Sequence, residues 1–338
     1  MLNKMSKGKL LDLPLSLRID CEKDVLCCKY SPNKEFFVAG HMDGIIRVYS
    51  AYDGNLINKL VRPDITEDLP VTSVQFRLNA HNSQASALLS TYTDGRVLIW
   101  DYENGKVLLD LKENRQVLGS AYHPKLNKFL TVGDNAAIYL YNAETGQREQ
   151  TYEKGTLSDV VDGHTSRVFT AVFHPQQTSE FVSGGWDSVV HFWDLRTHHS
   201  IRFIRGVHMC GEGLDISKSG RELLTCSYSK DNSLQLWHYQ QGRLLANIEP
   251  DLFKCQLYCG QWVTSDTIIV GGTDPNLLRV VSLKSLSTIM HYKGNSSGVY
   301  CLDHYIKTSK AGKKDSVGDI RTVYSIDKLL IQSDFMLK

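Results

Sequence analysis

Hydrophobic and polar residues alternate along short segments of this chain, and tight turns separate the segments. Side chains two residues apart lie on one face of a strand, so this alternation predicts half-buried β-strands. Residues 168–173, 181–184 and 189–193 form the clearest set, with a turn at Asp187 between the last two segments. An outer strand at 199–204 completes a small antiparallel sheet of four strands.

The same unit recurs from one end of the chain to the other. An Asp or Asn in a tight turn is followed six or seven residues later by an anchor position, which is aromatic in most copies. The anchors are Tyr49, Trp100, Tyr141, Trp193, Trp237, Val281 and Ser333, spaced 41 to 52 residues apart. A period of this size is typical of one four-stranded sheet per repeat. The chain is therefore predicted to be all-β, with seven such sheets.

The fourth repeat carries a family resemblance. Gly163-His164 is followed by Ser183-Gly184-Gly185-Trp186-Asp187 and then by Trp193-Asp194. This order resembles a WD repeat, and the whole tandem array resembles a WD-repeat β-propeller. The first three repeats lack the Gly-His pair, and the last two lack the aromatic anchor. The resemblance implies a seven-bladed β-propeller with four antiparallel strands in each blade.

The two ends of the chain fit a closed ring. After Asp334 too few residues remain for a fourth strand in the seventh blade, at about 296–338, whereas residues 9–20 precede the first repeat. We expect this N-terminal segment to supply the missing strand, which would hide sheet edges that promote aggregation. A repeat array buries its core between neighbouring units, so residues 1–338 are predicted to form a single propeller domain.

Charge and composition exclude several classes of function. Lys and Arg number 38 against 37 Asp and Glu, a net charge of +1, so nothing draws the chain toward nucleic acid or an anionic membrane. No apolar run is long enough for a signal peptide or a membrane span. We expect an intracellular protein, in the cytoplasm first, with nuclear, cytoskeletal or ciliary association left open.

The eight cysteines contain no paired C-x-x-C element. Several lie in predicted strands, where a free thiol behaves as a small buried hydrophobe. A metal site formed by Cys255, Cys259 and His208 is the weaker alternative. No Gly-rich loop follows a strand and opens a helix, so no nucleotide site is indicated. We therefore expect no metal and no cofactor.

His164, Ser183 and Asp187 are the three residue types of a hydrolase triad. A nucleophilic serine needs an exposed position on a sharp turn beside an oxyanion hole, whereas Ser183 lies inside a predicted strand. The resemblance implies instead a structural relay, in which the Trp193 indole meets Ser183, Ser183 meets His164 and His164 meets Asp187. The chain is predicted not to be an enzyme.

The remaining class of function is binding of a partner by the rim of the disc. The start of each inner strand and the residue before each turn Asp build its upper rim, where a rigid scaffold carries loops for binding. Aromatic residues and an arginine of the type that dominates interface hot spots gather there. They are Arg167, Phe169, Trp186, Tyr258 and Tyr300. Phe169 and Trp186 also resemble part of the peptide-binding rim of the WD-repeat subunit of histone lysine methyltransferase complexes.

Two further features bear on partners. Trp193-Asp194-Leu195-Arg196 resembles the element by which substrate receptors of cullin-4 ubiquitin ligases dock on their adaptor, with Arg196 as the docking cation. A lysine-rich loop in the last blade reads as a solvated hairpin or as a contact for an acidic surface; its lysines are Lys307, Lys310, Lys313 and Lys314. The sequence favours a scaffold that binds peptide segments or domains of a larger assembly, with a cullin-4 substrate receptor as the alternative.

Overall fold

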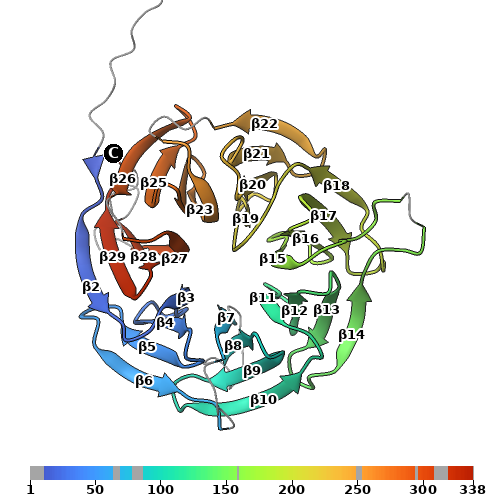
Figure 1. The fold of residues 1–338 in the computed structure, drawn as a ribbon, viewed down its shortest axis with the longest axis horizontal. Coiled ribbons are helices and arrows are strands. Elements are labelled where there is room, and N and C mark those ends of the chain that lie inside the picture. The colour runs from blue at the N-terminus through green and yellow to red at the C-terminus, as the bar shows by residue number, and fades with distance from the viewer. Residues whose placement is uncertain are drawn as a thin grey trace, which may run out of the picture.

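Seven small sheets are arranged in a ring and form a disc (Figure 1). Their inner strands line a central channel. The computed structural model describes residues 11–63, 69–77, 87–157, 160–248, 253–293, 296–307 and 319–337. Within these ranges each sheet is one blade, so the predicted seven-bladed β-propeller is confirmed. The described residues contain no helix, and so no helix able to cross a membrane.

Each of the first five blades runs from an inner strand at the channel to an outer strand at the perimeter. Blade 1 contains β3 (Val25–Tyr30), β4 (Phe36–His41), β5 (Ile46–Ser50) and β6 (Leu56–Leu60). Blade 2 contains β7 (Val71–Phe76), β8 (Ala87–Tyr92), β9 (Arg96–Asp101) and β10 (Lys106–Lys112). Blade 3 contains β11 (Val117–Tyr122), β12 (Lys128–Gly133), β13 (Ile138–Asn142) and β14 (Arg148–Tyr152). Blade 4 contains β15 (Val168–Phe173), β16 (Glu180–Gly185), β17 (Val189–Asp194) and β18 (Arg202–Arg205). Blade 5 contains β19 (Leu214–Ile216), β20 (Glu222–Cys226), β21 (Leu234–His238) and β22 (Arg243–Asn247).

The N-terminal segment completes the last two blades. Blade 6 contains β23 (Gln256–Thr264), β24 (Thr267–Thr273), β25 (Leu277–Ser282) and β26 (Ser287–Lys293), and β1 (Leu11–Asp12) adds to its edge. Blade 7 contains β27 (Val299–Ile306), β28 (Ile320–Ile326) and β29 (Leu329–Phe335), and β2 (Leu15–Asp20) pairs with β29 in antiparallel register. The prediction that an N-terminal strand closes the last blade is therefore confirmed.

The expected single closing strand at 9–20 is wrong in one detail, because the segment divides at Leu13-Pro14. β1 pairs in parallel with β26, and the Leu13 backbone N–H donates to the His291 carbonyl at 2.9 Å. Leu13 itself is buried against residues of blades 6 and 7. Proline has no N–H for a ladder, so the chain leaves blade 6 here and passes to blade 7. Residues 9 and 10 lie outside the described part of the chain.

The hydrophobic core lies between neighbouring blades. One cluster joins Leu130 and Val132 of blade 3 to Phe181 and Trp193 of blade 4. The rings of Phe181 and Trp193 stack with their centroids 5.8 Å apart, and neither is exposed to solvent. The anchor Trp193 thus packs against the preceding blade, which explains why aromatic and large apolar residues recur at this position.

The tight turn of each repeat is built by its Asp or Asn. In blades 1 to 4 the side-chain oxygen of this residue accepts the backbone N–H two residues later, at 3.1–3.3 Å. The residue between them has a positive φ, from 60° at Ser188 to 92° at Gly95. Asp and Asn stabilise such turns with their own side chains. The Asp or Asn pattern used to count the repeats therefore marks a turn geometry that recurs in these blades.

Candidate functional site

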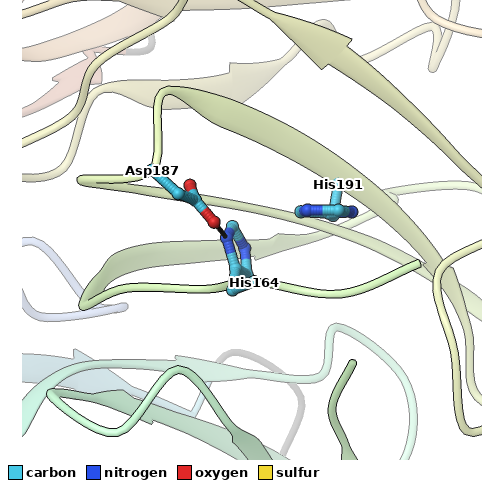
Figure 2. A group of neighbouring side chains, drawn as sticks. All are labelled: His164, Asp187 and His191. Atoms are coloured by element: carbon cyan, nitrogen blue, oxygen red, sulfur yellow. Dashed lines mark hydrogen bonds and ion pairs between the residues drawn. The ribbon is translucent and has the colours of Figure 1, made fainter. Parts of the chain in front are cut away.

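The polar relay of blade 4 lies inside the blade, beside the turn between β16 and β17 (Figure 2). The Trp193 indole N–H donates to Ser183 Oγ at 2.8 Å, and Ser183 Oγ lies 2.7 Å from His164 Nε2. His164 Nδ1 in turn lies 2.8 Å from Asp187 Oδ2. The structure thus brings together all four residues that the resemblance placed in a relay.

Three of the four relay residues are closed to solvent, and Asp187 is half-buried. Ser183 and Trp193 are fully buried, and His164 is 2% exposed. Ser183 Oγ is enclosed by the fold, and Trp193 and His164 are its hydrogen-bond partners. A catalytic serine requires the opposite arrangement. The relay therefore stabilises the fold.

Electrostatics around the relay follow from burial. Burial alone would raise the pKa of Asp187, but hydrogen bonds from His164 and from backbone N–H groups hold this pKa below its usual range. Burial lowers the pKa of the neighbouring His191 to about 3, and repulsion from His164 acts in the same direction. His191 is consequently a neutral ring within the fold, and its Nδ1 lies 2.8 Å from Ser200 Oγ.

His164, Asp187 and His191 place ligand atoms of the type that binds metal within 4.8 Å of one another, the one such group among the described residues. Figure 2 shows that the His164 ring points at Asp187. Since both nitrogens of His164 already have protein partners, a metal would have to break the relay. The predicted alternative with Cys255, Cys259 and His208 does not assemble, because the two thiols meet backbone carbonyls and His208 meets Ser188.

Other blades contain partial relays that the sequence did not reveal. In blade 2 the Trp100 indole donates to Ser90 Oγ at 2.9 Å, as Trp193 does to Ser183. No histidine follows the pattern there; instead Arg62 donates to the turn residue Asp94 at 3.1 Å. A guanidinium thus takes the place of the imidazole at the turn carboxylate.

Blade 3 repeats this substitution more fully. Arg115 donates to Thr131 Oγ1 at 2.9 Å and to the turn residue Asn135 at 2.7 Å. Thr131 and Asn135 are the counterparts of Ser183 and Asp187 in the strand register. Arg115 precedes Asn135 by about the spacing that separates His164 from Asp187, so the printed sequence did contain a signal for it.

The predicted rim residues lie together around the upper mouth of the channel. We call Phe169, Trp186, His208, Tyr228, Tyr258 and Tyr300 the aromatic sector. Phe169 and Trp186 have ring centroids 5.6 Å apart, and Trp186 lies 6.4 Å from His208. On the other side, Tyr258 lies 5.0 Å from both Tyr228 and Tyr300. His208 and Tyr228 were not predicted, because His208 lies in the connection between β18 and β19 and Tyr228 in the loop between β20 and β21, outside the two rim positions taken from the repeat pattern.

The two halves of the aromatic sector are joined by the chain between them. The His208 carbonyl accepts the Tyr228 N–H at 2.7 Å, and the Trp186 indole donates to Cys210 Sγ at 3.3 Å. Arg167 stacks its guanidinium 5.0 Å from the centre of the Trp186 ring. Trp186 is nevertheless 44% exposed, so this large apolar ring has a free face at the rim.

A cross-channel ion pair lies below the aromatic sector. Lys29 Nζ of blade 1 lies 2.7 Å from Glu212 Oε2 of blade 5, and Gln75 of blade 2 donates to Oε1 of the same carboxylate at 3.2 Å. Burial alone would lower the pKa of Lys29, but Glu212 and Asp303 raise it above its ordinary value. These contacts brace three blades across a channel of about 490 Å³.

Two aspartates on the channel wall hold the backbone of the next blade. Asp215 of blade 5 accepts the Trp262 N–H at 2.7 Å, and Asp303 of blade 7 accepts the Tyr30 N–H at 2.8 Å. Burial raises the pKa of Asp215 to about 7. The channel therefore contains a carboxyl group that titrates near neutral pH.

Arg196 lies on the opposite face of the disc, because it follows β17 whereas Trp186 precedes it. Its side chain is 78% exposed, yet its Nε and Nη2 donate to both oxygens of Asp194, at 2.8 and 2.6 Å. In the lysine-rich loop, Lys307 pairs with Asp334 at 2.9 Å. Lys310, Lys313 and Lys314 lie outside the described residues.

Comparison with known proteins agrees with this geometry. The family model "WD domain, G-beta repeat" matches residues 16–50 and 155–194. Both matched segments end where the third strand of a blade ends, at Ser50 of β5 and at Asp194 of β17. The second segment contains the complete relay.

Several curated proteins are similar over part of this chain. Pre-mRNA-processing factor 19 of Mus musculus is 25% identical over 173 residues, which are 51% of this chain and 32% of that protein. Periodic tryptophan protein 2 of Arabidopsis thaliana is 25% identical over 234 residues, 67% of this chain and 23% of that protein. THO complex subunit 6 homolog of Danio rerio is 24% identical over 234 residues, 62% of this chain and 66% of that protein. The match thus spans a third or less of the first two relatives.

Proposed function

Because this chain belongs to the WD-repeat β-propellers, we propose that it is a non-catalytic scaffold that binds peptide segments or domains of a larger assembly through its upper rim. The observation that carries the proposal is the aromatic sector at the channel mouth. It combines the exposed Trp186 ring and five half-buried aromatic rings with Arg167 on a ring of rigid sheets. Aromatic residues and arginine supply most of the binding energy in protein interfaces.

The aromatic sector differs from the aromatic residues that stabilise the fold. Trp100 and Trp193 are buried anchors between strands, and each indole N–H has a buried hydroxyl partner. Trp186 instead leaves 44% of its surface exposed at the rim. An exposed aromatic ring beside other aromatic rings is the kind of surface that marks interaction sites. A binding role for Trp186 explains its exposure.

The relatives bear on the kind of assembly. One is by name a pre-mRNA-processing factor and another a subunit of a complex. Pre-mRNA is processed in the nucleus, so these names favour a nuclear assembly over the cytoplasmic place expected from the sequence. Protein partners remain our proposal for this chain.

The test compares two variants of blade 4. Phe169→Ala with Trp186→Ala removes the centre of the aromatic sector, whereas Phe203→Ala removes a similar exposed ring from the outer strand β18. Phe203 is 41% exposed and lies 5.1 Å from the Arg205 guanidinium, which matches the Trp186 environment closely. Both variants should keep the free energy of unfolding within about 1 kcal/mol of the parent, because surface changes are small.

Partner binding should separate the variants. We expect the double variant to lose its partners in co-purification from native cells, with affinity reduced more than about tenfold, while Phe203→Ala keeps them. Normal folding with every partner retained would place the recognition face elsewhere. Recovery of a cullin-4 adaptor that is lost with Arg196→Ala would favour the substrate-receptor alternative.

A further inference from the structure

Neighbouring inner strands approach one another closely at one repeated pair of positions. In blades 2 and 3 this pair is Ser73 and Ser120, whose hydroxyl oxygens lie 3.1 Å apart. In blades 3 and 4 it is Gly119 and Ala171, and a Cβ at Gly119 would lie 2.5 Å from the Phe169 carbonyl oxygen. At these two junctions the pair is formed by small residues, whereas other junctions place Val74, Leu214 or Leu302 at its second position.

At the junction of blades 7 and 1 both positions are cysteines. Cys301 of β27 and Cys28 of β3 are the counterparts of Ser73 and Ser120 in the strand register. Their Sγ atoms lie 3.3 Å apart, and both residues are buried in one cluster. Of the seven such pairs, all within the described ranges, this is the one that holds two thiols.

We propose that Cys28 and Cys301 are a modification site, at which a hydroperoxide forms a reversible disulfide that joins the first and last blades covalently. The position makes this bond different from a disulfide elsewhere in the chain. The ring is otherwise closed without a covalent link, by the pairing of β2 with β29 and by packing between β27 and β3. A bond between residues 28 and 301 encloses nearly the whole propeller.

The chemistry balances with one equivalent of hydroperoxide. One thiol loses its proton, and its sulfur attacks the peroxide oxygen; the O–O bond breaks, leaving a sulfenic acid and an alcohol. The second sulfur then attacks the sulfenic sulfur, so the S–S bond forms and the S–O bond breaks. The departing hydroxide takes the second thiol proton and leaves as water. Ser325 Oγ lies 3.1 Å from Cys301 Sγ and is placed to exchange a proton with it.

Burial decides when the reaction takes place. The hydrogen bond with Cys301 and the loss of solvent both raise the pKa of the Cys28 thiol, so the closed ring reacts slowly. Separation of β27 from β3 exposes both sulfurs to the oxidant. Once formed, the bond holds the junction closed until a thiol reductant breaks it, as expected for a disulfide inside cells.

The experiment oxidises the purified full-length chain with hydrogen peroxide, alone and in urea below the unfolding midpoint. Remaining thiols are blocked, and mass spectrometry of unreduced peptides locates any crosslink. We expect a Cys28–Cys301 crosslink, formed faster in urea, and a thermal midpoint raised by about 5 °C until dithiothreitol is added. The control Cys28→Ser with Cys301→Ser reproduces the serine pair of blades 2 and 3, so it should fold and show neither effect.

A second control separates this pair from its neighbours. Cys27 lies on the same strand but directs its sulfur at the Val71 carbonyl of blade 2, at 3.8 Å. Cys27→Ser should therefore keep the crosslink and the rise in thermal midpoint. The proposal is overturned if urea with peroxide gives no Cys28–Cys301 crosslink, if other cysteines pair instead, or if the double-serine control shows the same rise.

Discussion

Ser183→Ala tests the relay most directly, because Ser183 Oγ lies at its centre. The substitution removes the acceptor of the buried Trp193 indole and the partner of the buried His164 Nε2. Blade 2 offers a matched variant, Ser90→Ala. Ser90 Oγ accepts the buried Trp100 indole in the same way, and its other side-chain contact, to the Tyr92 hydroxyl, is long at 3.4 Å.

The expected magnitudes follow from the number of polar groups left without partners. A buried donor or acceptor that loses its partner costs about 1–3 kcal/mol. Ser183→Ala leaves two such groups, so we expect the free energy of unfolding to fall by about 2–6 kcal/mol. Ser90→Ala leaves one indole and should cost about 1–3 kcal/mol. The lost hydroxyl group is the same in both variants, so the difference between their losses in free energy of unfolding measures the contribution of His164.

Urea unfolding followed by tryptophan fluorescence measures the free energy of unfolding of both variants. The two values are compared when the free energy falls with urea concentration at the same slope. The double variant His164→Leu with Ser183→Ala completes a cycle, since removing the stranded imidazole should make the double variant cost less than the two single variants added together. Equal losses for Ser183→Ala and Ser90→Ala, together with additive effects in the cycle, would refute the relay reasoning. A hydrolytic activity that disappears with Ser183→Ala would refute the non-enzymatic assignment.

Three further outcomes follow from the structure. Deleting residues 1–20 removes β1 and β2 and should cause aggregation or a strongly lowered thermal midpoint. Deleting residues 1–12 removes β1 alone and should have a smaller effect. If both deletion variants melt at the same temperature as the parent, closure of the ring by β2 is contradicted. Burial raises the pKa of Asp215 from 3.8 to about 7, so its contribution to stability is fully present below pH 3.8 and is lost as the pH rises from there to about 7. Asp215→Asn should therefore gain stability relative to the parent between about pH 4 and 7 in urea titrations, and a constant difference over this range would contradict the prediction. Arg115→Ala should lower the free energy of unfolding by about 2–4 kcal/mol, because Thr131 and Glu113 lose a buried partner. The control Arg148→Ala should change it by less than about 1 kcal/mol. Similar losses in the two variants would contradict the role of Arg115 in the relay.

The sequence was sufficient for the fold because each turn Asp or Asn marks local backbone geometry. The turn forms from its own side chain, and the anchor six or seven residues later is fixed by the length of one strand. Period and strand pattern then determine the number of blades. The split of the N-terminal segment was missed because β1 contains two residues, too few to show a pattern.

The polar contacts were less predictable, since their partners lie far apart in the sequence. Arg62 reaches Asp94 across the long connection between β7 and β8, which hides the usual spacing. Lys29 and Glu212 are 183 residues apart and meet because the ring brings blades 1 and 5 to one channel. Such pairs can be identified only when the closure of the ring and the register of its strands are known.

The relay and the aromatic sector share one turn, which connects the stability of blade 4 with the proposed binding surface. Asp187 is held by His164 and by the Thr165 N–H, at 2.8 and 3.0 Å. Trp186 immediately precedes it, and its backbone N–H donates to the Arg167 carbonyl at 2.9 Å. The buried relay therefore fixes the backbone that presents the exposed ring, and fixing it before binding reduces the entropy lost when a partner docks. Loss of His164 should then weaken binding without removing any atom of the rim, which is why Trp186→Ala, and not a relay variant, tests the surface itself.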